Sequence, residues 1–510
     1  MTLTDARQLW PFDVEPREVQ LEALAAGFGK PGFAYFMRQR LGKTWTAFAE
    51  FTILRQQGKV DWCVIIAPNS IKDQWREQIE EVSPFIPICI YSSQRKDQTR
   101  HFFSRNKKGG VFIINYESLR VFLEEFDMLE LQDTPIFDTK RTYVVADEST
   151  KIKDPKSRMC KAALGFSREC AYARVLSGRP TANSHADMWA QLKFIKATEL
   201  NFHQHKHRYV VMGGYQGRQF LRNVNTSILQ AHMKPHIYIA PDKYLTGFKK
   251  EYEPMRRVVL NPGLQSMYKR MEDDLIFELN SDTKITAPIA LTRYLRLQQI
   301  SSGIAGDEDG NQHNLVEPKD NARIRVVREI LESEIDHKVI IPCRFRLSMK
   351  NLYDTLLKDG HKVSVMMGNM GSERIEEQKK KFNEGDNNIM LAQLQVLSFG
   401  HTLPGPDNNP CDSMIYYEND FSLLNRMQSE SRPEKFGRDV PISYYDMYAS
   451  KMDRHMLSAL IRKDRAGLDL MGYAKNMGLR PDLGEDPKQP PKNDFPELDI
   501  LEENEETSVD

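Results

Sequence analysis

Two short groups of residues have the types and spacing needed to handle a nucleotide. The first is Leu41-Gly42-Lys43-Thr44, which follows the apolar run 33–37 and begins a helical pattern. In such a strand-to-helix turn, backbone N–H groups and the positive end of the helix form a cradle for phosphate. We expect Lys43 to neutralise the β- and γ-phosphates of ATP and the Thr44 hydroxyl to ligate Mg²⁺. The full GxxxxGK[ST] pattern has a glycine where Met37 stands.

The second group is the acidic pair Asp147-Glu148, which ends the apolar run 142–146. At the carboxyl end of a buried strand, Asp147 can ligate Mg²⁺ through water while Glu148 polarises the attacking water. The alternative interpretation is an exposed acidic turn. A strand that delivers two adjacent carboxylates after a strand–GKT–helix unit favours ATP hydrolysis.

These groups must be positioned by strands that alternate with helices. Short apolar runs recur at 33–37, 62–67, 111–115, 142–146 and 174–176, and again at 338–341, 362–366, 388–392, 413–417 and 442–447. Helical patterns lie between them, as at Thr44–Arg55 and Glu373–Asn383. This alternation predicts βαβ units with largely parallel sheets. The fold class is therefore α/β, with two lobes.

The predicted domain boundaries follow from the same pattern. We expect an N-terminal ATP-binding lobe at 1–198, a mainly helical insertion and linker at 199–325, and a C-terminal lobe at 326–470. Beyond residue 470, Pro, Asp, Glu and Lys dominate, which predicts an acidic, disordered tail at 471–510.

Composition limits the function classes. The formal net charge is zero, but residues 481–510 carry eleven acidic and two basic residues, which leaves 69 basic against 60 acidic in the remainder. A basic body is compatible with a polyanionic partner such as nucleic acid. No apolar stretch is long enough for a membrane helix and no secretory pattern is present, so we expect an intracellular, cytoplasmic location.

The spacing of the cysteines and histidines bears on possible disulfide and metal sites. The six cysteines are scattered without a CxxC pair, which argues against a zinc ribbon or disulfide framework and favours buried free thiols. The run His203, His205 and His207 could suggest a metal site. It lacks an acidic cluster or an HExxH helix, so a basic surface loop is the preferred interpretation.

Further motifs appear in a fixed order around these groups. They are Pro16–Gln20 (a Q-motif segment), Ile65–Ser70 with Gln74-Trp75 (motif Ia), Asn115–Glu117 (Ib), Asp147–Asp154 (a DEAH-x-[IL]-K-N box with Thr150 in place of His), Leu176–Ser184 with Trp189 (III), Val339–Arg346 (IV), Ser398–Leu403 (V) and Gln428–Arg438 (VI). Over about residues 14–465 the chain thus resembles the Swi/Snf family of helicase superfamily two, in its compact bacterial or phage-encoded type. In a phage-encoded protein the expected location is the host cytoplasm.

The resemblance implies two RecA-like lobes that close on ATP and Mg²⁺ and move along nucleic acid, which in this family is double-stranded DNA. It implies that Arg17 and Gln20 contact the nucleotide, Gln20 at the adenine edge, beside Leu41 and Gly42. It also implies that Arg432 and Lys435 of motif VI reach the γ-phosphate.

The nucleic-acid track and its coupling to the nucleotide are assigned by the same resemblance. The candidate residues are Asn69, Ser70, Asn115, Tyr116, Ser177, Gly178, Asn183, Arg344, Arg346 and Gly400. We expect contacts chiefly to phosphate, with steep salt dependence. Protein partners are expected through the acidic tail.

Three departures from the family pattern leave alternatives open. Arg40 replaces a phosphate-loop glycine and requires a permissive backbone conformation. Lys435 stands where the second motif VI arginine is usual, so either Lys435 or Arg438 takes that place. Motif V lacks its GGxG start. The alternatives to a duplex translocase are a strand-separating DNA or RNA helicase and a weakly hydrolysing ATP-dependent clamp or scaffold.

Overall fold

The computed structural model describes residues 1–460 except 39, 128–137, 179, 182–183, 214–218, 245–249, 281–286, 308–310, 399–400, 421, 436–439, 451–452, 455 and 459. The chain divides into two compact units, with the boundary between Thr246 and Gly247. The expected acidic tail lies outside the described residues. Among the described residues, no helix has the length and apolar character that crossing a bilayer requires.

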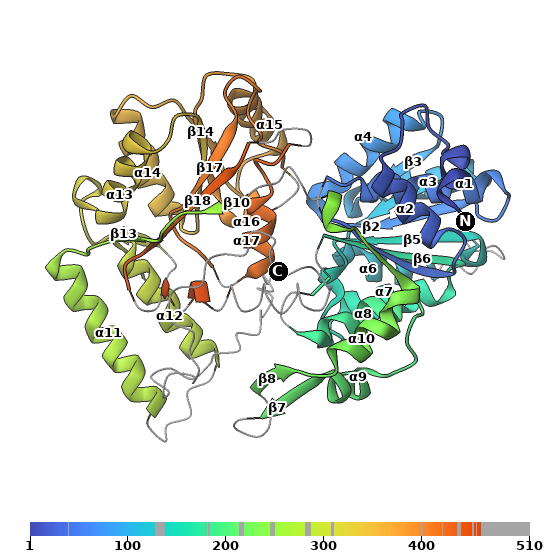
Figure 1. Cartoon of the computed structure of the whole chain (residues 1–510), viewed down its shortest axis with the longest axis horizontal. Helices are drawn as coiled ribbons and strands as arrows, with labels where there is room; N and C mark the ends of the chain where they lie inside the picture. The colour runs from blue at the N-terminus through green and yellow to red at the C-terminus, as the bar shows by residue number, and fades with distance from the viewer. Residues whose placement is uncertain are drawn as a thin grey trace. The chain divides into compact units, whose positions relative to one another are not determined.

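Seven strands form the sheet of the first unit (Figure 1). They are β1 (Gly32–Phe36), β2 (Trp62–Ile66), β3 (Ile88–Ile90), β4 (Gly110–Ile114), β5 (Thr142–Asp147), β6 (Tyr172–Ser177) and β9 (Ile237–Ile239). The order is β3-β4-β2-β5-β6-β1-β9, and neighbouring strands are parallel. All five apolar runs expected here form strands, because a parallel sheet is buried on both faces and its strands are continuously apolar.

Helices cover both faces of this sheet. They are α1 (Leu3–Leu9), α2 (Glu18–Gly27), α3 (Lys43–Gln56), α4 (Lys72–Val82), α5 (Lys96–Arg105), α6 (Tyr116–Asp127), α7 (Arg158–Glu169), α8 (Met188–Phe194), α9 (Phe202–Tyr209) and α10 (Thr226–Met233). Short 3₁₀ turns are η1 (Asn69–Ile71), η2 (Ser93–Arg95), η3 (Thr139–Arg141), η4 (Ser149–Ile152), η5 (His185–Asp187), η7 (Lys234–His236) and η8 (Asp242–Tyr244). One apolar core lies between the sheet and α2, α3 and α4; the other lies between the sheet and α5 to α10.

The second unit has its own parallel sheet, in the order β10-β18-β17-β14-β16-β15, and β11 also pairs with β18. Its strands are β10 (Lys250–Tyr252), β11 (Arg256–Arg257), β14 (Lys338–Cys343), β15 (Val363–Met366), β16 (Ile389–Gln393), β17 (Cys411–Tyr416) and β18 (Ile442–Tyr448). The five apolar runs expected in this half are confirmed as strands. The prediction of an α/β fold with parallel sheets flanked by helices is therefore confirmed in both units.

Helices also flank this sheet. They are α11 (Pro262–Asn280), α12 (Ala287–Ser301), α13 (Ala322–Ser333), α14 (Arg346–Lys358), α15 (Ser372–Asn383), α16 (Leu394–Leu397) and α17 (Leu423–Glu430), with the turn η9 (Pro318–Asp320). The pair α13 and α14 packs on one face of the sheet, and α15 and α16 pack on the other. Helices α11 and α12 enclose a separate small apolar cluster.

The segment 199–325, expected to be mainly helical, also contains short strands. The antiparallel hairpins are β7 (Val210–Gly213) with β8 (Gln219–Asn223), and β12 (Ile304–Gly306) with β13 (Gln312–Asn314). Within the same segment, β9 joins the first sheet beside β1, and β10 joins the second sheet beside β18. These strands have three to five residues, so they lack the long apolar run that predicts the main strands.

Candidate functional site

The predicted nucleotide-handling residues lie along one edge of the first sheet. The carboxyl ends of parallel strands share an edge, and the loops that follow them form the usual binding crevice of an α/β sheet. The register pairs Phe36 with Ser177 and Asp147 with Leu176. The loops that follow β1, β5 and β6 therefore begin side by side.

The phosphate loop (residues 40–44) turns at Gly42, which has φ 85° and is the N-cap of α3. Gln20 of α2 packs against this turn, and its Nε2 donates a hydrogen bond to the Gly42 carbonyl oxygen at 3.3 Å. A Cβ at Gly42 would overlap the Gln20 side-chain amide. Positive φ and close approach thus both require glycine here.

Arg17 and Gln20 support the loop from outside. Arg17 Nη1 donates to the Arg40 carbonyl oxygen at 2.6 Å, and Gln20 Oε1 accepts from the Arg17 backbone N–H at 2.8 Å. Both residues were expected to contact the nucleotide. In the structure they hold the backbone of the phosphate loop, and the adenine contact of Gln20 stays a prediction. Arg40 itself has φ 65°, the left-handed conformation anticipated for the residue in place of the usual glycine.

Lys43 and Thr44 form the first turn of α3 and are half-buried. Lys43 Nζ donates to the Arg38 carbonyl oxygen at 3.3 Å. Burial lowers the pKa of Lys43, and the nearby carboxylates of Glu148 and Asp147 oppose that shift. Thr44 and Asp147 are 103 residues apart in the sequence. The phosphate loop and the Asp147-Glu148 pair nevertheless lie close enough to interact electrostatically.

Asp147 is the last residue of β5 and is 6% exposed. Its Oδ2 accepts a hydrogen bond from Trp75 Nε1 at 2.8 Å, and its Oδ1 accepts from the Glu148 backbone N–H at 2.8 Å. Burial raises the pKa of Asp147, while Lys43 and these two donors counteract the shift. Its carboxylate is thus fixed in orientation by α4 and by its own turn.

Glu148 begins the turn η4 in a left-handed conformation, φ 49° and ψ 51°, and is half-buried. A non-glycine residue in this region is uncommon and costs about 1–3 kcal/mol, so such residues concentrate at functional sites. The conformation separates the side chain of Glu148 from that of Asp147, although the residues are adjacent. Two carboxylates with different surroundings suit two different chemical roles.

Tyr116 has a different position from the one expected for a nucleic-acid contact. Its side chain is 1% exposed, and its hydroxyl donates to the Asp147 carbonyl oxygen at 2.6 Å. Burial, with the charges of Asp147 and Glu148, raises the pKa of this hydroxyl well above its usual value. Tyr116 is therefore a neutral hydrogen-bond donor that holds the backbone at the end of β5.

The donor set fits a magnesium nucleotide. The turn at Gly42 and the N-terminus of α3 present backbone N–H groups, Lys43 adds a positive charge, and Thr44 and Asp147 supply oxygen ligands. Among the described residues, no group of three or more His, Cys, Asp and Glu is gathered as a protein metal cage.

The remaining residues of the first unit that were expected to contact nucleic acid differ in their exposure and hydrogen bonds. Ser177 is buried at the end of β6, where its carbonyl oxygen accepts from the Met37 N–H at 3.2 Å, and Gly178 follows it half-buried. Asn69 is exposed, and Ser70 follows it in η1. Asn115 donates to Glu117 Oε2 at 2.8 Å. Asn183 lies outside the described residues.

In the second unit, Arg346 is exposed at the start of α14, whereas Arg344 donates to Gln298 Oε1 at 2.6 Å. Arg432 is 5% exposed, and its guanidinium donates to the carbonyl oxygens of Ser398 at 2.7 Å and His401 at 3.2 Å.

Three candidate positions of the second unit remain, namely Lys435 and Arg438 of motif VI and Gly400 of motif V. Lys435 pairs with Asp407 at 2.7 Å on the surface. Gly400 and Arg438 lie outside the described residues.

Comparison with protein families gives two consecutive matches, and the first extends past the boundary between Thr246 and Gly247. A model described as SNF2-related domain matches residues 39–303, just over half of the chain, and one described as helicase conserved C-terminal domain matches residues 322–436. The chain belongs to the SNF2-related family. The first match includes the phosphate loop and the Asp147-Glu148 pair; the second includes Arg344, Arg346, Arg432 and Lys435.

Relatives of this SNF2-related chain include bacterial and eukaryotic proteins. An uncharacterised ATP-dependent helicase of Mycoplasma genitalium is 25% identical over 401 residues, covering 76% of this chain and 35% of the relative. The protein CHROMATIN REMODELING 5 of Arabidopsis thaliana is 19% identical over 444 residues, covering 83% of this chain and 25% of the relative. The chain thus spans about a third or less of the length of these relatives.

Among solved structures, the Sulfolobus solfataricus SWI2/SNF2 ATPase core in complex with dsDNA is 18% identical and gives a TM-score of 0.40 over 90% of this chain and 96% of that one. A TM-score of this size is too low to support a conclusion about function.

Trp75 and Gln191 are functional candidates of the SNF2-related chain that sequence reasoning missed. Trp75 was noted only as part of motif Ia, and its contact with Asp147 joins residues 72 positions apart. Gln191 lies two positions beyond Trp189 of motif III and bonds to Ser149. No pattern in the sequence indicates that Trp75 contacts Asp147 or that Gln191 contacts Ser149, because sheet register and helix rotation decide which side chains meet.

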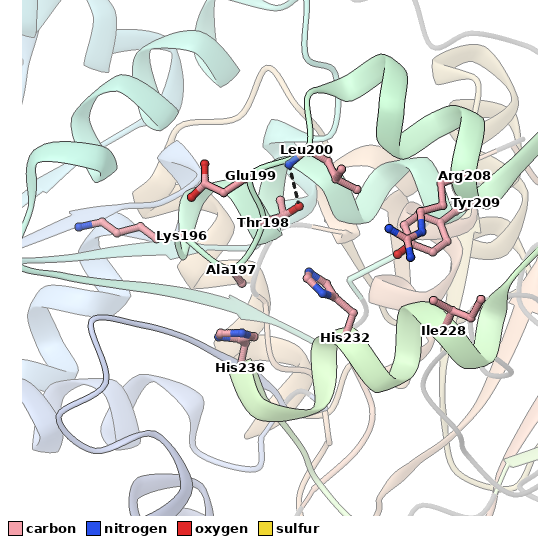
Figure 2. Close-up of a pocket in the computed structure, with 10 residues that line it drawn as sticks. All are labelled: Lys196, Ala197, Thr198, Glu199, Leu200, Arg208, Tyr209, Ile228, His232 and His236. Atoms are coloured by element: carbon pink, nitrogen blue, oxygen red, sulfur yellow. Dashed lines mark hydrogen bonds between the residues drawn. The ribbon is translucent and has the colours of Figure 1, made fainter.

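The histidine run lies on helix α9 and not in the surface loop that was expected. His203 and His207 are exposed on α9, whereas His205 is buried and its Nε2 lies 3.0 Å from the His185 carbonyl oxygen. A separate cavity of about 570 Å³ lies nearby, lined by His232 and His236 among others (Figure 2). Neither feature includes a residue of the phosphate loop.

Proposed function

We propose that this chain is an ATP-hydrolysing, nucleic-acid-dependent motor that translocates on double-stranded DNA. The observation that carries the proposal is the meeting of the phosphate loop with the Asp147-Glu148 pair at one edge of a parallel sheet, where Lys43 interacts with both carboxylates. Membership of the SNF2-related family supports the same activity.

Each candidate site residue of the first unit has a defined role in this proposal. The phosphate loop and Lys43 bind the β- and γ-phosphates, and Thr44 and Asp147 hold Mg²⁺, which neutralises the phosphate charge as it develops. Glu148 orients the attacking water and polarises it. Trp75 and Tyr116 keep Asp147 in place.

The second unit completes the cycle. We place Arg432, with Lys435 or Arg438, at the γ-phosphate in the closed state, so that ATP binding joins the two units and hydrolysis releases them. Nucleic acid contacts both units through Asn69, Ser70, Arg344 and Arg346, mainly at phosphates. The excess of basic residues outside the acidic tail supports a polyanionic partner.

The decisive experiment measures phosphate release while single-stranded DNA, duplex DNA or RNA is titrated, for the native chain and Glu148→Gln. We expect duplex DNA to raise turnover most, and Glu148→Gln to bind ATP but release phosphate at least ~10²-fold more slowly, because a positioned base contributes about that much. Equal rates in the two proteins would contradict the assignment of Glu148. Strand displacement without duplex tracking would establish the helicase alternative.

One observation favours a second candidate function, a weakly hydrolysing clamp. The Arg432 guanidinium bonds to two carbonyl oxygens of its own unit, and Lys435 pairs with Asp407. Should these contacts persist with nucleotide bound, the γ-phosphate would lack its cation from this unit and turnover would stay slow. DNA-dependent ATP binding with negligible phosphate release would identify this clamp.

A further inference from the structure

One buried glutamine joins the turn that carries Glu148 to the loop after β6. Gln191 on α8 is 0% exposed. Its Oε1 accepts a hydrogen bond from Ser149 Oγ at 2.8 Å. Its Nε2 donates to the Pro180 carbonyl oxygen at 2.5 Å and to the Asp187 carbonyl oxygen at 3.3 Å.

The link joins the turn that carries Glu148, which orients water in the proposed motor, to the loop that carries the motif III segment. Ser149 directly follows Glu148 and is the first residue of η4. Pro180 lies in the loop between β6 and η5, the segment matched to motif III. The link needs both ends of an amide, because Oε1 must accept while Nε2 donates. A side chain that only fills space cannot replace it.

A second observation distinguishes this region from ordinary core. Thr150 and Thr181, which follow Ser149 and Pro180 directly, are 3% and 4% exposed. Within the described part of the chain neither hydroxyl has a hydrogen-bond partner. Buried unpaired hydroxyls are rare because each has lost its hydrogen bonds to water without gaining a partner in the protein. Both loops therefore contain polar groups that can gain partners if the loops shift together.

We propose that Gln191 is a positioning residue that, through Ser149, holds the Glu148 turn in register with the loop after β6 and thereby sets how strongly nucleic acid stimulates hydrolysis. This inference rests on the proposed function. It assigns a role to two side chains, Ser149 and Gln191, outside the nucleotide-binding set. Both side chains are 0% exposed and neither belongs to the residues assigned to nucleotide binding, so we expect the link to act on turnover rather than on ATP affinity.

The test compares Ser149→Ala, Gln191→Met and the double variant with the native full-length chain. For each, kcat and KM for ATP are measured with and without duplex DNA, together with thermal stability. Ser167→Ala is the matched control, since the Ser167 hydroxyl is fully buried in the same unit and donates to Leu164 of its own helix at 3.2 Å. Ser149→Ala deletes one oxygen atom and guards against a general folding defect in Gln191→Met.

We expect each single variant to lower the DNA-stimulated kcat roughly tenfold, with KM for ATP within about twofold and basal turnover little changed. The double variant should be no worse than Gln191→Met, because both substitutions break the same link. Stimulation equal to that of Ser167→Ala would overturn the inference, as would effects that multiply in the double variant. If the native chain shows no DNA-stimulated hydrolysis, the proposed function itself fails, which is a distinct result.

Discussion

Asp147 and Glu148 are adjacent in sequence but differ in their surroundings. Asp147 is held by the Trp75 indole and by the Glu148 backbone N–H, whereas Glu148 begins a turn in a left-handed conformation. Ligands of a metal are generally oriented by a further layer of hydrogen bonds, which affects metal affinity or activity. In the proposed magnesium site, Trp75 would be such a partner for Asp147.

At the residue scale we predict that Trp75→Phe weakens the response to magnesium. The substitution keeps an aromatic ring but removes the hydrogen bond to Asp147 Oδ2. The Mg²⁺ concentration for half-maximal ATP hydrolysis should rise about tenfold, with kcat largely recovered at saturating Mg²⁺. A magnesium titration of steady-state turnover measures this.

Trp189→Phe is the matched control for that experiment. Trp189 also lies in the first unit and donates its Nε1 hydrogen bond to the Leu200 carbonyl oxygen at 2.8 Å, away from Asp147. Identical magnesium curves for the two variants would refute a role for Trp75 in the site.

The central site residues could be predicted from the sequence, whereas the side chains that orient them could not. Lys43, Thr44, Asp147 and Glu148 stand next to the ends of strands whose apolar runs are unmistakable, so their edge of the sheet follows from topology. Tyr116 was expected to contact nucleic acid because it stands in motif Ib of the resembled family, yet its side chain is rotated into the core, where its hydroxyl donates to the Asp147 carbonyl oxygen. That rotation depends on how α6 packs, which no local pattern encodes.

At the scale of elements, α3 is tied to the sheet by a buried ion pair. Glu50 accepts two hydrogen bonds from the Arg174 guanidinium, at 2.5 and 2.8 Å, and both side chains are 0% exposed. The hydroxyls of Tyr35 and Tyr143 donate to the same carboxylate at 2.7 and 3.0 Å. The helix that begins at the phosphate loop is thus fixed to β1, β5 and β6 by one acidic residue.

We predict that Glu50→Gln destabilises the first unit by about 3–5 kcal/mol, because it leaves the Arg174 charge buried without its counter-charge. Chemical denaturation followed by tryptophan fluorescence measures the loss. Glu15→Gln is the control: it removes the exposed Arg7–Glu15 pair and should cost less than about 1 kcal/mol. A loss of similar size in both variants would show that burial does not determine the strength of this pair.

His401, in the motif V segment, gives an element-scale prediction about pH. Burial lowers the pKa of His401 to about 4, with repulsion from Lys379 and Arg432 adding to the shift and Glu376 opposing it. The unfolded residue takes up a proton near pH 6.5, whereas the folded one does not until about pH 4. Its contribution to stability is therefore present above pH 6.5 and is lost progressively as the pH falls towards 4.

Accordingly, His401→Gln should lose less thermal stability between pH 7 and pH 5 than the native chain does. Melting curves at the two pH values measure the difference. His203→Gln, at an exposed position, serves as the control and should behave like the native chain. A native-like pH response of His401→Gln would contradict the assigned environment.

The main strands were predictable from sequence, but the short ones were not. The ten expected runs all form strands because most of their residues are apolar and buried within a parallel sheet. In contrast, β3 and β9 are three-residue edge strands with half-buried residues, and β10 has two charged residues followed by a tyrosine. Their place is decided by pairing with an existing edge, so a local pattern could not reveal the strands within 199–325.

At the scale of the whole molecule, the proposal requires both units to act on one nucleotide. We predict that Arg432→Ala lowers kcat about 10³-fold or more, the contribution expected of an arginine finger, while ATP affinity changes only a few-fold. Lys435→Ala is measured in parallel because Lys435 and Arg438 are alternatives for the second cation. ATP binding and single-turnover hydrolysis separate the two effects.

The control for this prediction must address stability, because Arg432 also bonds to Ser398 and His401 within its own unit. Arg432→Lys retains a positive charge and one donor nitrogen but loses the bidentate geometry. Intermediate turnover with native-like melting would support a catalytic role. Unchanged turnover in Arg432→Ala would leave the second unit without a part in hydrolysis.

The segment between β6 and β9 makes a detour that leaves the first sheet and returns to it. The chain leaves after β6, builds α8, α9, the β7–β8 hairpin and α10, and returns to pair with β1 at Ala34–Phe36. Because both ends of this detour are anchored beside the strand that enters the phosphate loop, and because α8 carries Gln191, the part that can be lengthened or exchanged without moving Lys43 is the β7–β8 hairpin. Evolution could therefore remodel this hairpin, and an engineer could graft a reporter or recognition module there while the catalytic edge stays intact.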